Sequence, residues 1–207
     1  MPEVPPLSVP ELLEQARAGD AAARNRLFEM CRSYVAISAK AEMASWLRAK
    51  VDASDLIQQT LLEAHRGLDK FRGNTEAEWL GWLRQILAHN AADFVRQFHG
   101  VEKRKAAREV PLQTEDESHG ELQLADGGDS PSQIVLRKEL QLQMADAIAR
   151  LPEDYQQVII LRNMQRLPFD EVAELMGRSR PATQMLWARA VRKLQELLPN
   201  TGAGSQS

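Results

Sequence analysis

Apolar residues recur at intervals of three and four along most of this chain, and this is the period of an α-helix that buries one face. The pattern fills residues 9–98 and returns at residues 133–198. Neither block alternates apolar and polar residues in the way that a half-buried strand does. The sequence therefore predicts an all-α protein, with one helix near 76–98 and a short one near 169–176 among its elements.

Between the two blocks the sequence is acidic, poor in large apolar residues and rich in Gly, Ser and Asp. Such a segment buries too little apolar surface to offset the chain entropy that folding costs. We therefore expect a flexible linker at 101–132 between two small helical domains, which span 9–100 and 133–198. The last residues, 199–207, are expected to form a disordered tail.

The composition of the 207-residue chain, 43% hydrophobic and 27% charged, is typical of a soluble globular protein. No apolar run approaches the roughly 20 residues that a membrane helix needs, and the start is unlike a signal peptide. We therefore expect a cytoplasmic protein without membrane insertion. The single cysteine, Cys31, has apolar neighbours at helical spacing and is expected to be a buried thiol. A net charge of −3 argues against a protein that coats nucleic acid by charge alone.

The stretch VDASDLIQQTLLEAHRGLDKFRG predicts a helix whose polar residues crowd its first turns. Asp52 or Ser54 is placed to cap the helix, and acids in the first turn are favoured by the helix dipole. Asp55, Gln58 and Gln59 follow close behind. By themselves these residues indicate only a helix-capping cluster.

The segment after residue 168 has the build of a helix-turn-helix motif. Gly177 supplies a tight turn after a short helix, and Ser179 or Arg180 is placed to cap a second helix. In such motifs the second helix enters the major groove of DNA by its N-terminal residues. A helical hairpin with a solvated basic face that touches no DNA has the same turn and remains an alternative. The residues expected at base edges or phosphates are Arg178, Ser179, Arg180, Thr183, Gln184, Arg189, Arg192 and Lys193.

Taken together, the two halves resemble the extracytoplasmic-function (ECF) group of RNA polymerase sigma factors. In the first half, DASDLIQQTLLEAHRGLDKFRG followed by WLGWLRQILAHNAADFVRQ is similar to the family's acidic-Leu-x-Gln helix, Phe-Arg-Gly turn and Trp-Leu helix. In the second half, LPEDYQQVIILRNMQRLPFDEVAELMG followed by WARAVRKL looks like its DNA-reading domain. The resemblance covers roughly residues 10–100 and 136–198.

The resemblance implies two surfaces in the first half and one in the second. One helix would dock on the clamp of core RNA polymerase, through Asp52, Asp55, Leu56, Gln58 and Gln59. The helix-turn-helix would bind the promoter's minus-thirty-five element. The residues implied at the melted minus-ten element are Phe71, Arg72, Gly73, Asn74, Trp79, Trp82, Arg84, Asn90 and Arg96. For at least one of Trp79 and Trp82, a position in the core is a competing interpretation.

The implied function is promoter recognition and duplex opening with core RNA polymerase, and the implied partners are core RNA polymerase and promoter DNA. The resemblance leaves open whether an anti-sigma factor also binds. A polymerase-independent helix-turn-helix regulator explains the C-terminal motif equally well and is the rival interpretation.

No pattern in the sequence indicates a catalytic or metal site. His65, His89, His99 and His119 show no metal-ligand spacing with one another or with Cys31. The sequence also lacks a Gly-rich phosphate loop. We therefore expect no cofactor, no metal and no enzymatic activity.

Overall fold

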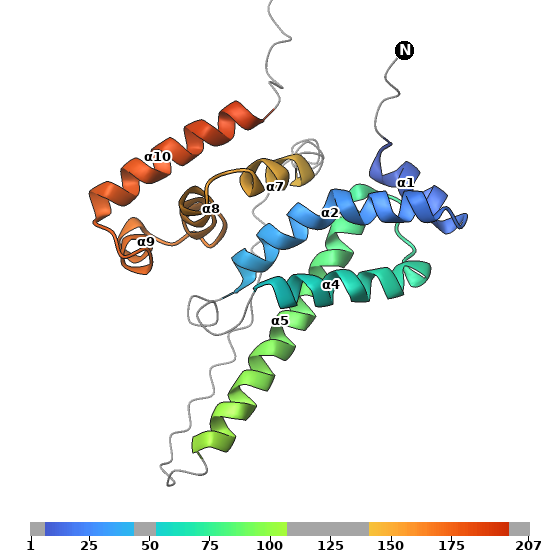
Figure 1. The fold of residues 1–207 in the computed structure, drawn as a ribbon, viewed down its shortest axis with the longest axis horizontal. Coiled ribbons are helices and arrows are strands. Elements are labelled where there is room, and N and C mark those ends of the chain that lie inside the picture. The colour runs from blue at the N-terminus through green and yellow to red at the C-terminus, as the bar shows by residue number, and fades with distance from the viewer. Residues whose placement is uncertain (1–6, 44–52, 107–140, 199–207) are drawn as a thin grey trace, which may run out of the picture.

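The computed structural model describes residues 7–43, 53–106 and 141–198, with side chains up to residue 96 in the second range. Every regular element within these residues is helical, which confirms the expected all-α fold. The elements, shown in Figure 1, are α1 (Val9–Arg17), α2 (Ala21–Glu42), α4 (Ala53–Gly67), η1 (Leu68–Lys70), α5 (Glu76–Ala106), α7 (Gln141–Ala149), α8 (Glu153–Ile159), η2 (Ile160–Met164), α9 (Phe169–Leu175) and α10 (Arg180–Leu197).

Local signals define the first two helices. The backbone N–H of Ser8 donates to Glu11 Oε2 at 2.7 Å, which closes a capping box at the start of α1. Gly19 then adopts a φ of 95°, a conformation that glycine reaches without steric cost. Asp20 caps α2 by accepting from the backbone N–H groups of Ala22 and Ala23. The pair Gly19 and Asp20 therefore ends one helix and starts the next.

The next two helices lie on either side of a short turn. α4 begins at Ala53, so Ser54 lies inside its first turn, while Asp52 is outside the described residues. The helix ends at Gly67, and the 3-10 turn that follows ends at Lys70. α5 was expected to end near residue 98 but continues to residue 106, into the first part of the expected linker. The Lys, Arg, Glu and Ala residues there are strong helix formers, and a single interior glycine costs only about 1 kcal/mol.

The C-terminal helices begin and end at proline, glycine and capping residues. Pro152 precedes α8, whose last turn widens into the π-helical turn η2. After α9, Gly177 adopts a φ of 62°, and the Ser179 side chain accepts from Ala182 N at the start of α10. Pro181 lies in the first turn of α10, where its missing N–H leaves no helical hydrogen bond unmade. The predicted helix-turn-helix build is confirmed.

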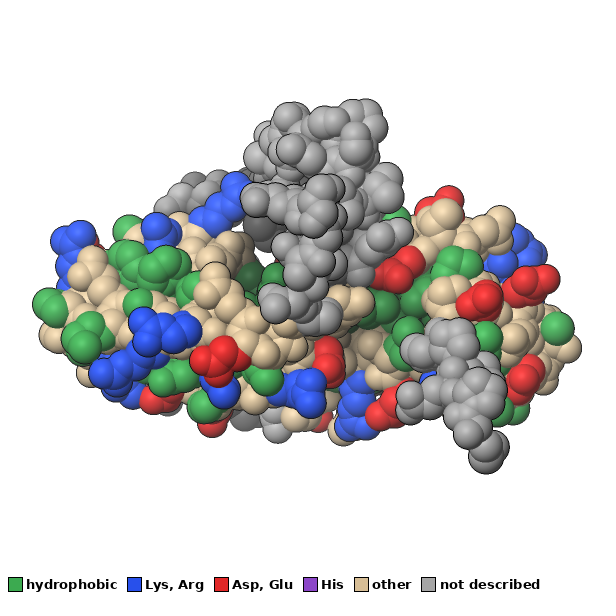
Figure 2. Space-filling view, turned by 90° about the horizontal axis from the view of Figure 1, so that it is seen from above, with side chains coloured by type: hydrophobic (Ala, Val, Ile, Leu, Met, Phe, Trp, Pro, Cys, Tyr) green, Lys and Arg blue, Asp and Glu red, His purple; other side chains and the backbone are tan. Residues whose placement is uncertain are grey.

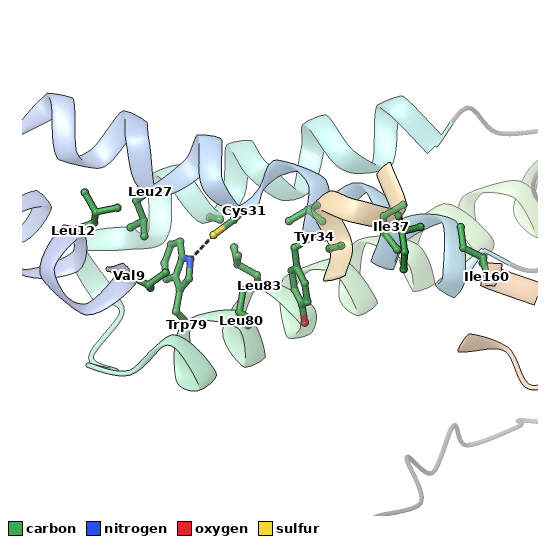
Figure 3. Packing of buried hydrophobic residues seen from close by; sticks show 14 of the residues in the cluster. Val9, Leu12, Leu27, Cys31, Tyr34, Ile37, Trp79, Leu80, Leu83 and Ile160 are labelled. Atoms are coloured by element: carbon green, nitrogen blue, oxygen red, sulfur yellow. Dashed lines mark hydrogen bonds between the residues drawn. The ribbon is translucent and has the colours of Figure 1, made fainter. Parts of the chain in front are cut away.

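A hydrophobic core runs through both halves of the described chain. In the N-terminal half Trp79 of α5 packs against α1 and α2, and its Nε1 donates to the Sγ of Cys31 at 3.0 Å (Figure 3). Met164, at the end of η2, is 41% exposed and lies outside this core. The same cluster joins residues of both halves, among them Leu12, Leu27, Tyr34, Ile37, Leu83, Ala145, Ile148, Val158, Ile160 and Val172.

α2 is the element that the two halves share. α7 and η2 both pack against it, and Figure 1 shows α2 between the N-terminal helices and α7. Two polar bonds extend the contact: Lys40 Nζ donates to Gln156 Oε1 at 2.9 Å, and Gln165 Nε2 donates to the backbone oxygen of Ala41 at 2.8 Å. In this structure the halves therefore touch along one face of α2.

No helix within the described ranges combines the length and the apolar character that crossing a bilayer requires.

Candidate nucleic-acid interface

The first turns of α4 carry the residues that were expected to dock on polymerase. Asp55, Gln58 and Gln59 are exposed, and Gln59 Nε2 donates to Glu63 Oε1 at 2.7 Å, one turn further along the helix. Leu56 is different, because it is 1% exposed and packs in a small apolar cluster between α2, α4 and α5. Its assignment to the interface is corrected here: Leu56 anchors the helix, and its polar neighbours are the part that a partner can reach.

The turn between η1 and α5, which we call the 71–74 turn, is built on a buried aromatic ring. Phe71 is 8% exposed; its ring stacks on Trp82 with centroids 5.0 Å apart and meets Trp79 edge-on at 5.3 Å. A Cβ on Gly73 would clash with Cζ of the Phe71 ring and would lie 2.8 Å from the Cβ of Glu78, so glycine is required for this close approach.

Two side chains from outside hold the 71–74 turn. Arg17, in the last turn of α1, donates to Asn74 Oδ1 at 2.7 Å, to the Gly73 carbonyl at 2.5 Å and to the Phe71 carbonyl at 3.1 Å. Glu78 Oε2 accepts from Asn74 N at 2.9 Å. The hydrogen bonds that this carboxylate accepts from the backbone of Asn74 and from the side chain and backbone of Thr75 lower the pKa of Glu78 from its ordinary value. Asn74, which both Arg17 and Glu78 contact, is itself exposed.

Three residues that were expected at the minus-ten element are buried. Trp79 is 0% exposed and Asn90 is 3% exposed, and Asn90 Nδ2 donates to Thr60 Oγ1 at 3.4 Å. Phe71 lies beneath the turn as described above. In this conformation none of the three presents its side chain to a base, so we assign them to supporting the surface. Trp82 is half-buried and keeps part of its ring at the surface.

The three arginines expected at the minus-ten element differ in their surroundings. Arg72 and Arg96 are exposed, and Arg96 pairs with Asp93 one turn earlier on α5. Arg84 is half-buried: its Nε donates to Tyr34 Oη at 2.8 Å, and its Nη2 donates to Gln141 Oε1 at 3.3 Å. Because Gln141 belongs to α7, the C-terminal half covers this candidate DNA contact in the present arrangement.

In the helix-turn-helix, the arginines at the start of α10 are paired with acids. Arg178 Nη2 lies 2.5 Å from Asp154 Oδ2, and Arg180 Nη1 lies 3.5 Å from Asp170 Oδ2. Thr183, expected at a base edge, is 0% exposed and donates to the Ser179 carbonyl at 3.0 Å, so it stabilises the helix start instead.

The remaining candidates line the outside of α10. Gln184, Arg189 and Arg192 are exposed, and Lys193 is exposed with its Nζ 2.9 Å from Glu196 Oε2. Figure 2 shows Lys and Arg side chains gathered at the end of the molecule that α9 and α10 form. This basic surface suits a polyanion, because clustered cations replace the counterions that surround phosphates.

Within the described residues, no group of three or more His, Cys, Asp or Glu side chains is arranged to hold a metal ion. Burial raises the pKa of the Cys31 thiol to about 12, so at neutral pH it is a protonated core residue.

We did not predict from the sequence that Arg17 and Glu78 hold the 71–74 turn. The spacing of Thr75 and Glu78 is the Thr-x-x-Glu signature of a capping box, and it was available in the sequence. Arg17 left no such signal. A basic residue in the last turn of a helix is explained by the helix dipole alone, and its partners lie more than fifty residues further along the chain.

Comparison with known proteins identifies both halves. Residues 23–99 match the family model described as sigma-70 region 2, and residues 141–194 match the model described as sigma-70, region 4. The chain is 27% identical over 165 residues to the ECF RNA polymerase sigma-E factor of Haemophilus influenzae, covering 80% of this chain and 82% of the relative. It is 28% identical over 167 residues to the protein of that name in Escherichia coli K12, covering 80% and 81%.

Two solved structures align along most of the chain: CnrH in complex with the cytosolic domain of CnrY, at 22% identity and a TM-score of 0.35, and the RsbN–BldN complex, at 24% identity and a TM-score of 0.31. The first alignment covers 94% of this chain and 99% of the other, and the second covers 90% and 99%. Overlaps this loose add no argument, so the family membership rests on the sequence matches. The two family models match successive regions that together fill more than half of the chain, and this chain belongs to the ECF group of sigma-70 RNA polymerase sigma factors.

Proposed function

We propose that this sigma factor binds core RNA polymerase through the exposed start of α4, recognises promoter DNA with both halves and favours the melted duplex at the minus-ten element. Its partners are core RNA polymerase and promoter DNA, with an anti-sigma factor as a further candidate. It acts in the cytoplasm and supplies no catalytic step of its own. The observation that carries the proposal is the succession of a region 2 match and a region 4 match in one chain.

The polar surface of α4 supports the polymerase-binding part of the proposal. Asp55, Gln58 and Gln59 are held in position by a buried neighbour, Leu56, and no described part of the chain covers them. An acidic, amide-bearing helix start pairs well with basic groups on a partner. The family's docking helix corresponds to these positions in the sequence resemblance.

For DNA, the proposal narrows to side chains that a nucleic acid can reach. In the N-terminal half these are Arg72, Asn74 and the surface part of Trp82, at a turn built on buried aromatic rings, together with Arg96 several helical turns further along α5. A captured base needs polar groups for its edge and cations for its backbone, and this group supplies both. In the C-terminal half they are Arg178, Ser179, Arg180, Gln184, Arg189, Arg192 and Lys193.

Co-elution with core bacterial RNA polymerase on a sizing column, without DNA, tests the first step. We expect the parent chain to co-elute and Asp55→Arg to lose binding by at least about ten-fold, because a reversed charge at a charged contact costs more than about 1.4 kcal/mol. The matched control is Glu29→Arg, which makes the same charge change at an exposed position on α2.

A parent chain that elutes alone would favour the rival regulator, which binds duplex DNA without polymerase. Equal loss of binding in Asp55→Arg and Glu29→Arg would show a general charge effect and would remove α4 as the docking site.

A further inference from the structure

We infer that Arg17 is a positioning residue for promoter reading: it fixes the side chain of Asn74 so that the amide N–H₂ group, and not the oxygen, faces a base captured at the 71–74 turn. The inference rests on the proposed function, because it requires that the turn meets DNA. It adds to that function a residue on α1, a helix that carries none of the candidate polymerase or DNA contacts, and it states which end of the Asn74 amide faces the base.

The first step is the geometry of the guanidinium. Arg17 makes three hydrogen bonds to consecutive parts of the turn, to Phe71 O at 3.1 Å, Gly73 O at 2.5 Å and Asn74 Oδ1 at 2.7 Å. Its Cζ also lies 5.7 Å from the centre of the Phe71 ring. A planar fork of donors suits such an array of acceptors, whereas a lysine ammonium is a single point charge.

The second step concerns which end of the Asn74 amide faces outward. The oxygen and nitrogen of an amide are distinguished by their partners, and a guanidinium has donors only. The atom that faces Arg17 must therefore be Oδ1, as the 2.7 Å bond has it. Because the two ends of a planar amide point in different directions, the Nδ2 group of Asn74 is turned away from Arg17.

The third step is that the backbone of Asn74 is held independently of its side chain. Glu78 Oε2 accepts from the backbone N–H of Asn74 at 2.9 Å and from that of Thr75 at 3.0 Å. The close packing of Gly73 against Phe71 and Glu78 restrains the turn further. Removing Arg17 therefore frees the amide to rotate and releases the carbonyls of Phe71 and Gly73, while Glu78 and the packing of Gly73 still restrain the backbone of the turn. A preformed donor discriminates between bases better than a rotating amide, which offers donor and acceptor alike.

The chain provides a matched control in Arg24. This residue lies on α2, and its Nη2 donates to the His65 carbonyl at 3.1 Å and to Asp69 Oδ1 at 3.2 Å. Like Arg17, it ties an N-terminal helix to the segment between α4 and α5, but it touches no residue of the 71–74 turn. Arg24→Gln therefore removes a comparable tether without freeing Asn74.

The experiment uses holoenzyme assembled from core polymerase and the full chain. The probe is a pool of DNA duplexes with a mismatched central bubble, randomised on one strand, and the bound fraction is sequenced to give a base preference at each position. Parent, Arg17→Gln, Arg24→Gln and Asn74→Asp chains are compared, and co-elution with core polymerase is measured for each.

We expect the parent to prefer, at one position, a base that offers an acceptor to Asn74. In Arg17→Gln this preference falls by about ten-fold at that position alone, with polymerase binding unchanged, because an oriented amide discriminates between bases and a rotating one does not. Arg24→Gln keeps the parent's preference. Asn74→Asp keeps an acceptor for Arg17 but replaces the donor, so its preference moves to a base that offers an amino group.

The outcomes distinguish a failure of the inference about Arg17 from a failure of the proposed DNA-reading function on which it rests. A parent holoenzyme that selects no sequence from the pool overturns the proposed DNA-reading role of the turn, and the inference with it. A parent that selects while Arg17→Gln selects the same base equally well overturns the inference alone. Equal losses in Arg17→Gln and Arg24→Gln overturn it too, since a general loosening of the fold would then explain both.

Discussion

Among single residues, Cys31 is fully buried. Its sulfur accepts from Trp79 Nε1 at 3.0 Å in the core, where burial raises the pKa of the thiol from 9.0 to about 12. Below pH 9 the thiol is protonated in both the folded and the unfolded chain. Between pH 9 and 12 the unfolded chain loses this proton and the folded chain keeps it, so the free energy of unfolding falls as the pH rises.

We predict that Cys31→Ala lowers the free energy of unfolding by about 1–3 kcal/mol at pH 7, because it leaves a cavity and an unpaired indole N–H. The gap should close above pH 9 by up to about 1.4 kcal/mol per pH unit, since the variant has no thiol to titrate. Urea titrations of both proteins at several pH values from 7 to 10.5 measure this. A gap that stays constant over the series would contradict the raised pKa.

Which residues are buried was the part of the site that the sequence predicted least well. Asn90 was expected at DNA and lies in the core, and Thr183 is buried in the first turn of α10. For Trp79 the competing interpretation as a core residue is confirmed. Each was placed from its own helix, yet its burial depends on other elements: Cys31 on α2 for Trp79 and Thr60 on α4 for Asn90. Periodicity gives a helix an apolar face but does not say how wide the covered part of that face is.

At the scale of elements, the ends of helices were predictable because their signals are local. Gly19, Asp20, Gly177 and Ser179 act within a few residues of their own positions, through a left-handed backbone or a side-chain cap. The end of α5 was not, because no strong breaker follows residue 98 and the extra turns consist of ordinary helix formers.

Alanine substitutions at two glycines distinguish the effect of helix propensity from the effect of a left-handed backbone. Gly81 lies inside α5, and a Cβ there would meet nothing within 4 Å, so Gly81→Ala should raise the free energy of unfolding by about 0.5–1 kcal/mol. Gly177 also has open space around it but adopts a φ of 62°, so Gly177→Ala should lower the free energy of unfolding by about 1–2 kcal/mol. Thermal and urea unfolding of the two variants measure both changes. Shifts of the same sign would show that backbone conformation is not what distinguishes them.

For the whole molecule, the contact along α2 sets how the two halves are presented. The hydrophobic cluster that joins Tyr34 and Ile37 to Ala145 and Ile148 is continuous, and Gln141 of α7 holds Arg84 of α5. Freeing Arg84 for DNA therefore requires the C-terminal half to move away from α2. This arrangement was beyond sequence reasoning, because it joins elements on opposite sides of a long polar segment.

We predict that Ala145→Glu separates the halves. Ala145 is 5% exposed on α7, which packs mainly on α2, and an unpaired carboxylate buried there costs several kcal/mol. Small-angle scattering should show a larger radius of gyration, while circular dichroism should show nearly unchanged helix content. Gln143→Glu, which adds the same charge at an exposed position on the same helix, should leave both signals at the parent's values. An unchanged radius in Ala145→Glu would mean that the halves do not hold this contact in solution.

The stacked rings beneath the 71–74 turn also have a spectroscopic consequence. Trp79 and Trp82 lie 5.2 Å apart between ring centroids, and Trp82 stacks directly on Phe71, two residues from Gly73. Any nucleotide that settles on the turn changes the polarity around a partly exposed indole. The chain therefore carries an intrinsic fluorophore where its proposed ligand would bind, and replacing Trp46 and Trp187 by phenylalanine would leave emission from Trp79 and Trp82 alone.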